Sequence, residues 1–115
     1  MELLSSLERL RRARHGEWLL QIRAQLEEAL LPGCGVYLFG SRARGDWDGF
    51  SDTDLLVVGP NQGQAELQAE RLREQTIGDD VLAISRDRWE GIGPQSSPYW
   101  RAIRVQAQLL AGFSK

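Results

Sequence analysis

The sequence is nearly free of cysteine, histidine and lysine, and each scarcity excludes a kind of chemistry. The single cysteine, Cys34, has no partner for a disulfide within the chain, and its place between two glycines before an apolar run predicts a small packing residue. The single histidine, His15, has no second histidine or cysteine pair near it, which disfavours a histidine-based zinc site. Lys115 is the only lysine, so the positive charge is almost entirely arginine, which suits bidentate phosphate binding but also follows from a biased base composition.

Long hydrophobic runs and an excess of positive charge are also missing. No apolar run approaches the roughly 20 residues that cross a bilayer, and the N-terminal segment lacks the layout of a signal peptide. We therefore expect a cytoplasmic protein with no membrane association. The net charge of -2 disfavours binding of nucleic acid by charge alone, without excluding it. A length of 115 residues predicts one domain over residues 1–115.

Hydrophobic spacing predicts helices alternating with short strands. Gly16 is expected to break or bend the first helical region. The predicted elements are a helical region over 2–31, strands over 36–39, 53–58 and 79–85, a helix over 64–76, a brief helical turn over 85–89, and a C-terminal helix over 98–111. This order predicts an α/β (α+β) domain, in which a short mixed sheet of three or more strands packs against helices around a catalytic core over 36–90.

The most informative stretch lies between the first two predicted strands. An apolar run ends at Gly40-Ser41-Arg42-Ala43-Arg44-Gly45, and the next strand begins at Ser51-Asp52-Thr53-Asp54. Because side chains alternate along a strand, Asp52 and Asp54 face the same way, roughly 6 to 7 Å apart. Two carboxylates at that spacing can reach one divalent cation or bracket a pair.

Three better-known motifs fail at this stretch. A P-loop needs Lys and Ser or Thr after its second glycine, where Asp46 and Trp47 stand. A dinucleotide-binding fingerprint beginning at Gly33 has Leu38 at its third glycine and precedes the strand it should follow. A calcium loop starting at any nearby aspartate places an apolar residue at a ligand position.

What remains is suited to a nucleoside triphosphate with magnesium. The Gly40-Ser41 turn offers backbone N–H groups and a hydroxyl to phosphate, with arginines beside it. Magnesium prefers a few carboxylates together with phosphate oxygens and water. A third carboxylate would help to activate an attacking hydroxyl, and Asp80, at the start of the third strand, is the best candidate. A register slip of one residue would exchange it for Asp79.

These residues resemble the motif of the polymerase-beta-like nucleotidyltransferase superfamily, especially its minimal nucleotidyltransferase (MNT), antitoxin-like members. The resemblance implies that Gly40 and Ser41 hold the triphosphate and that Arg42 and Arg44 occupy basic positions near phosphate. It also implies a metal-binding catalytic triad of Asp52, Asp54 and Asp80, holding two Mg²⁺ ions, with Mn²⁺ as an alternative. For Arg44, an ion pair with Asp46 or Asp48 is an equal alternative.

The expected function is therefore that of an enzyme. It transfers a nucleoside monophosphate from an NTP, with ATP the expected nucleotide, to a hydroxyl acceptor. The resemblance suggests a small helical HEPN-type protein as partner and acceptor, in a toxin-antitoxin pair. The alternative is a non-catalytic nucleotide-binding module that covers its partner, and addition to a nucleic-acid end is a third hypothesis that the net charge disfavours. Self-association of the chain is left open.

The aromatic residues near this centre allow two roles. Trp47, Trp89 and Trp100 could stack on a nucleotide base, although packing is the more common role of such side chains. Phe39 and Leu55 are expected in the core.

Overall fold

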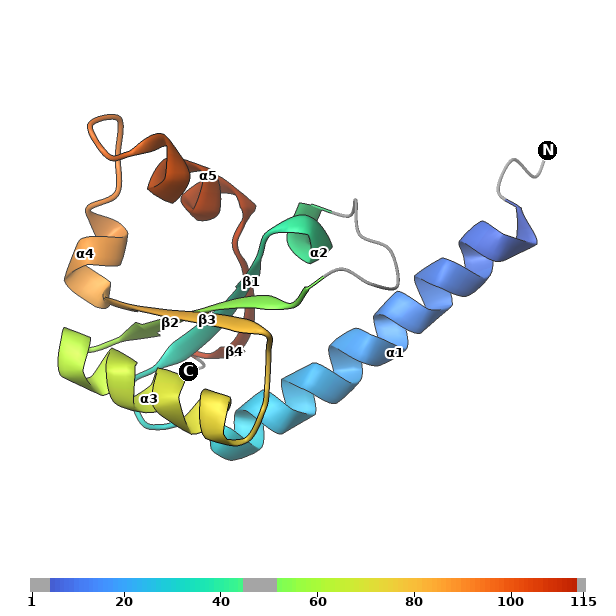
Figure 1. The fold of residues 1–115 in the computed structure, drawn as a ribbon, viewed down its shortest axis with the longest axis horizontal. Coiled ribbons are helices and arrows are strands. Elements are labelled where there is room, and N and C mark those ends of the chain that lie inside the picture. Colours follow the sequence, from blue (N-terminus) through green and yellow to red (C-terminus); the bar gives the residue numbers. More distant parts are fainter. Residues whose placement is uncertain (1–4, 45–51, 114–115) are drawn as a thin grey trace.

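A four-stranded mixed sheet with helices on both faces forms the body of the protein (Figure 1). The computed structural model describes residues 5–44 and 52–113. Its elements are α1 (Ser6–Ala29), β1 (Gly35–Phe39), α2 (Ser41–Arg44), β2 (Asp54–Gly59), α3 (Gln62–Glu74), β3 (Asp80–Ser85), α4 (Arg86–Glu90), α5 (Pro98–Gln106) and β4 (Gln108–Gly112). The predicted fold class is confirmed. None of the described helices is long and apolar enough to cross a membrane.

The strand order brings the end of β1 and the starts of β2 and β3 together at one end of the sheet. The order is β3-β2-β1-β4, with β1 antiparallel to both β2 and β4, and β2 parallel to β3. In this register Asp54 at the start of β2 lies between Phe39 at the end of β1 and Asp80 at the start of β3. The turn that follows β1 therefore meets the first residues of β2 and β3.

Each face of the sheet has its own apolar core, and β2 contributes to both. Leu55 and Val57 pack with α1 and α3, whereas Leu56 and Val58 pack with α4 and α5, and all four are fully buried. Burying such a side chain stabilises the fold by about 1.5–3 kcal/mol. Because side chains alternate along a strand, Asp54 faces the α4 and α5 side with Leu56.

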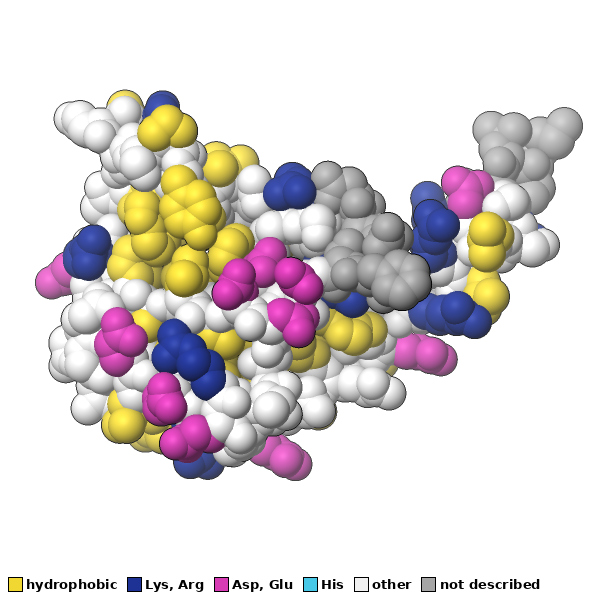
Figure 2. Space-filling view, in the orientation of Figure 1, with side chains coloured by type: hydrophobic (Ala, Val, Ile, Leu, Met, Phe, Trp, Pro, Cys, Tyr) yellow, Lys and Arg dark blue, Asp and Glu magenta, His cyan; other side chains and the backbone are white. Residues whose placement is uncertain are grey.

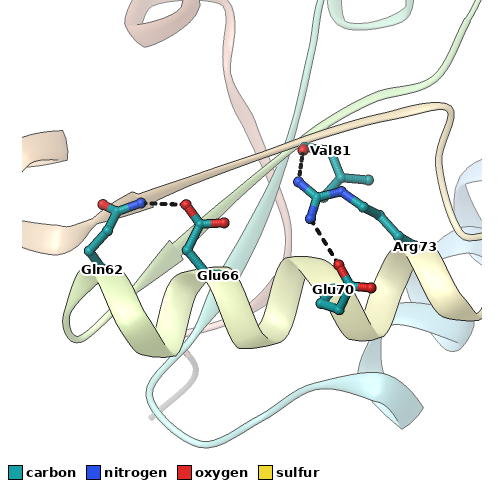
Figure 3. Close-up of polar contacts among 5 residues, drawn as sticks. All are labelled: Gln62, Glu66, Glu70, Arg73 and Val81. Atoms are coloured by element: carbon teal, nitrogen blue, oxygen red, sulfur yellow. Dashed lines mark hydrogen bonds and ion pairs between the residues drawn. The ribbon is translucent and has the colours of Figure 1, made fainter.

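The outer edge of the sheet, β3, is secured by side chains of α3. Arg73 donates from Nη2 to the Val81 carbonyl at 2.6 Å, as Figure 3 shows. Gln62 donates to the Ala83 carbonyl at 3.1 Å and accepts from the Ser85 amide at 3.1 Å. An edge strand otherwise exposes unpaired backbone groups. These contacts hold β3, and with it the acidic residue at its start, in place beside β2.

The predicted break at Gly16 is wrong, because α1 is one continuous helix of 24 residues. A glycine inside a helix costs only about 1 kcal/mol relative to alanine. That cost is offset at the start of the helix, where Ser5 and Glu8 form a capping box, and further along, where Ile22 and Leu26 are buried. The low helix propensity of Gly16 alone is therefore too weak to interrupt the helix.

The predicted C-terminal helix over 98–111 is too long. Ser97 caps α5 and Pro98 stands in its first turn, as expected, but the helix ends at Gln106 and β4 follows. Leu110 fits helical spacing equally well, and it is buried instead on a strand beside β1. Without β4, the outer side of β1 would expose its backbone hydrogen-bonding groups. Pairing with β1 therefore decides that residues 108–112 form a strand.

Candidate active site

The turn after β1 requires glycine at position 40. Gly40 has a φ of 81°, in the left-handed region, and a Cβ built there would overlap the Asp54 carboxylate. The absence of a side chain lets the backbone approach that carboxylate closely. The Gly40 amide donates to Gln106 Oε1 at 3.2 Å, and Arg44 Nη1 lies 3.5 Å from the same oxygen. Two of the predicted phosphate donors thus converge on one acceptor oxygen.

Acidic side chains gather opposite this turn. Asp54 is half-buried, and Asp80, its register partner, is exposed. Burial raises the pKa of Asp54, and the negative charges of Asp80, Asp52 and Asp79 raise it further, against an opposing effect of Arg44. The carboxylates are thus close enough to repel one another, which favours a proton or a cation among them.

The structure distinguishes the positions of the two candidates for the third carboxylate. Asp79 accepts a hydrogen bond from the Thr53 amide at 2.7 Å and borders a pocket next to α1. Asp80 borders the same pocket as Asp54. The assignment of Asp80 as the third acidic residue stays a prediction, and the geometry favours it over Asp79.

A pocket of about 370 Å³ lies between the acidic residues and α5. Its polar half is formed by Gly40, Arg44, Asp54, Asp80 and Gln106. In Figure 2, acidic side chains are gathered at the centre of the molecule, next to a cluster of apolar side chains. The pocket thus combines donors suited to phosphate with carboxylates suited to a cation.

The predicted basic positions separate in space. Arg44 borders the pocket, whereas the Arg42 guanidinium lies 4.5 Å from the centre of the Trp18 ring on α1. A cation over an aromatic face is attractive, so Arg42 fastens α2 to α1. Ser41 opens α2 and is half-buried, outside the residues that border the pocket. Asp46 and Asp48, the alternative ion-pair partners of Arg44, lie outside the described residues.

Sequence reasoning missed the contribution of α5. Gln106 is 66 residues from Gly40 in the chain, and no motif or periodicity links the two.

Among the tryptophans, Trp89 is buried against Tyr37, with ring centres 5.1 Å apart, so it packs as expected. Trp47 lies outside the described residues.

The donor set suits magnesium, although the described residues contain no group of three acidic, histidine or cysteine side chains gathered to hold a metal ion. Magnesium usually takes one or two carboxylates and completes its shell with substrate phosphates and water. Asp54 and Asp80, with Asp52 nearby, fit that pattern, because a cation would offset both the burial and the neighbouring negative charges that raise the pKa of Asp54. Such a site would be completed by the nucleotide.

The fold and this site define the class of protein: a small α+β domain with a glycine turn facing paired aspartates, the arrangement of a nucleotidyltransferase. Comparison with protein families matches residues 17–92 to the family described as nucleotidyltransferase domain, and the chain belongs to that family. The match ends before α5, whose side chains complete the pocket. No curated protein and no solved structure gives a significant match.

Proposed function

We propose that the protein transfers a nucleoside monophosphate from an NTP, with ATP the expected nucleotide, to a hydroxyl group in the presence of Mg²⁺. One observation carries the proposal. The Gly40 amide and the Arg44 guanidinium meet at Gln106 Oε1 inside the pocket that Asp54 and Asp80 border. An oxygen already occupies the point where the two donors converge, and a phosphate oxygen can take its place. The family membership supports the same class of reaction.

Asp52, Asp54 and Asp80 would hold the metal, with Mn²⁺ as an alternative ion. When bound, the metal neutralises charge on the phosphates and on the leaving pyrophosphate. The chain itself orients the triphosphate through Gly40 and Arg44.

The reaction forms a bond from the acceptor oxygen to the α-phosphorus and breaks the bond to the bridging oxygen, which leaves with pyrophosphate. The acceptor proton must pass to a base. Asp80 is exposed at the border of the pocket and is suited to accept it.

Calorimetric titration with ATP and Mg²⁺ tests the site. The wild type should bind, and a double variant with Asp52→Asn and Asp54→Asn should lose at least about 100-fold in metal-dependent affinity, because mutations around a metal site cost 10- to 100-fold even beyond the direct ligands. Asp87→Asn is the matched control, since Asp87 is an exposed aspartate on α4. Unchanged metal-dependent binding in the double variant would refute the proposed site.

A second candidate is a nucleotide-binding module that acts by covering its partner. Ser41 and Arg42, two residues of the motif, do not border the pocket, and this favours the module. For either function we propose a small helical HEPN-type partner, in keeping with the MNT-like motif. Incubation with labelled ATP and the product of the neighbouring gene separates the two. Label on the partner that depends on Asp54 supports transfer, and tight association without label supports the module.

A further inference from the structure

The half of the pocket that faces α5 is apolar and has no part in the proposed chemistry. It is formed by Phe39, Leu82, Tyr99, Ala102 and Ile103. Phe39 and Ile103 are buried in the core of that face, but the Tyr99 side chain is 58% exposed. Figure 2 shows the apolar surface beside the acidic side chains. Contiguous apolar surface next to a charged site usually marks a binding surface.

A nucleoside triphosphate has the same division, since charged phosphates occupy one end and a flat aromatic base the other. We propose that the α5 side of the pocket is the nucleoside subsite, with the base stacked on Tyr99. This inference rests on the proposed function. The phosphates then lie toward Gly40 and Arg44, in the polar half. This arrangement uses both halves of one pocket for one ligand.

Tyr99 is the aromatic residue best placed for this role. Trp89 is only 3% exposed, and Trp100 is half-buried against the core. The Tyr99 and Trp100 rings meet nearly edge-on, with centres 5.8 Å apart, and the Tyr99 side chain stays largely exposed to a ligand. Stacking of a base on an aromatic side chain is a common mode of nucleotide binding.

The helix that carries Tyr99 contacts the body through Ile103 and Arg104. Ile103 is buried, and the Arg104 guanidinium lies 4.5 Å from the centre of the Trp89 ring on α4. Ser97 caps the helix by accepting from the Trp100 amide at 3.3 Å. A tyrosine side chain has only two χ angles, so it loses little conformational entropy when a base stacks on it.

The apolar half of the pocket also implies a preference among nucleotides. Of its five side chains only Tyr99 carries a polar atom, so stacking dominates over hydrogen bonding to the base edge. Purines stack over a larger area than pyrimidines. ATP and GTP should therefore bind similarly, and both more tightly than CTP or UTP.

The test compares ATP with inorganic tripolyphosphate, which lacks the base, each titrated with Mg²⁺. The Tyr99→Ala variant should bind ATP about 5- to 150-fold more weakly and tripolyphosphate as the wild type does. Tyr99→Phe should retain ATP binding. Leu67→Ala is the matched control, because Leu67 is also 58% exposed but lies on α3.

The outcomes separate this inference from the proposed function. Equal ATP affinity in Tyr99→Ala and the wild type overturns the subsite and leaves the function standing. Equal loss for both ligands also overturns it, since the effect would then be structural. Binding of neither ligand by the wild type refutes the function and the subsite together. Tighter binding of CTP than of GTP contradicts the stacking argument.

Discussion

The Asp54 carboxylate lowers the stability of the fold and is also a ligand of the proposed metal site. Its carboxylate is half-buried at the start of β2, against Gly40 and beside Asp80. Burial first and neighbouring negative charges second raise its pKa. A group held in an unfavourable charge state at neutral pH is typical of a functional site.

Asp54→Asn should make the protein more stable and inactive. Because the pKa of Asp54 is higher in the folded than in the unfolded state, the folded state binds more protons between the two values. Stability therefore falls as pH rises through that window and stays reduced at neutral pH. Asparagine cannot ionise and removes the penalty, so the Tm at pH 7 should rise, and the gain should vanish at a pH below the unfolded-state pKa. Nucleotide transfer should fall at least about 100-fold.

Thermal unfolding at several pH values measures this effect, with Asp87→Asn as the control. Asp87 lies in the first turn of α4, where a negative charge is favourable, so its neutralisation should not raise the Tm. A Tm of Asp54→Asn at or below that of the wild type at neutral pH would contradict the argument.

At the scale of elements, one buried side chain joins α3 to the end of α1. Gln68 is fully buried, accepts from the Leu31 amide at 2.6 Å and donates to the Ala29 carbonyl at 3.0 Å. Arg71 also donates to that carbonyl, at 2.8 Å. The last carbonyls of a helix need such partners. Gln68 thus satisfies backbone groups at the end of α1, where the chain turns toward β1.

Gln68→Leu should destabilise the fold by about 1–3 kcal/mol, because the Leu31 amide loses its partner while Ala29 keeps Arg71. Urea denaturation measures the loss. Gln64→Leu on the same helix is the control, since Gln64 is exposed and should change stability by less than about 0.5 kcal/mol. Similar losses in both variants would show that the buried hydrogen bonds are not the cause.

At the scale of the whole molecule, α1 divides into a packed half and a projecting half. Its buried residues are Ile22, Leu26 and Ala29, whereas residues 6–14 are all exposed, including Leu7 and Leu10. Figure 1 shows the N-terminal half extending away from the body. Isolated helical segments of this length are marginal in water, so most of the stability of α1 comes from its C-terminal half.

Hydrogen exchange should report this division. Amides in residues 6–14 should exchange at least about 100-fold faster than those in residues 22–29, since local opening needs little free energy where no tertiary contact is lost. Mass spectrometry of peptides from each half gives the comparison at a protein concentration of a few micromolar. Slow exchange over 6–14 would mean that another surface covers this half in solution, and a dilution series would then show whether that surface is a second copy of the chain.

The acidic motif, and the order of the strands and main helices as far as α5, could be predicted from the sequence because they depend on local chemistry. Alternating apolar runs predict a sheet, and glycine at Gly40 suits the turn after β1, where φ is 81°. The two-residue spacing of Asp52 and Asp54 predicts that both side chains face the same way, and this stays a prediction because β2 begins only at Asp54. These features lie within a few residues of one another. The proposed chemistry, too, follows from this short stretch.

Only the tertiary structure decided the features that depend on partners far along the chain. Whether 108–112 continues a helix or forms β4 depends on the free side of β1, and the choice between Asp79 and Asp80 depends on the register of β3 with β2. Gln106 and Tyr99 enter the pocket because α5 packs over it. The sequence by itself predicted Gly40, Arg44, Asp54 and Asp80, which the structure places around one pocket. Packing of α5 decided what forms the rest of that pocket, because this contact joins segments about 60 residues apart.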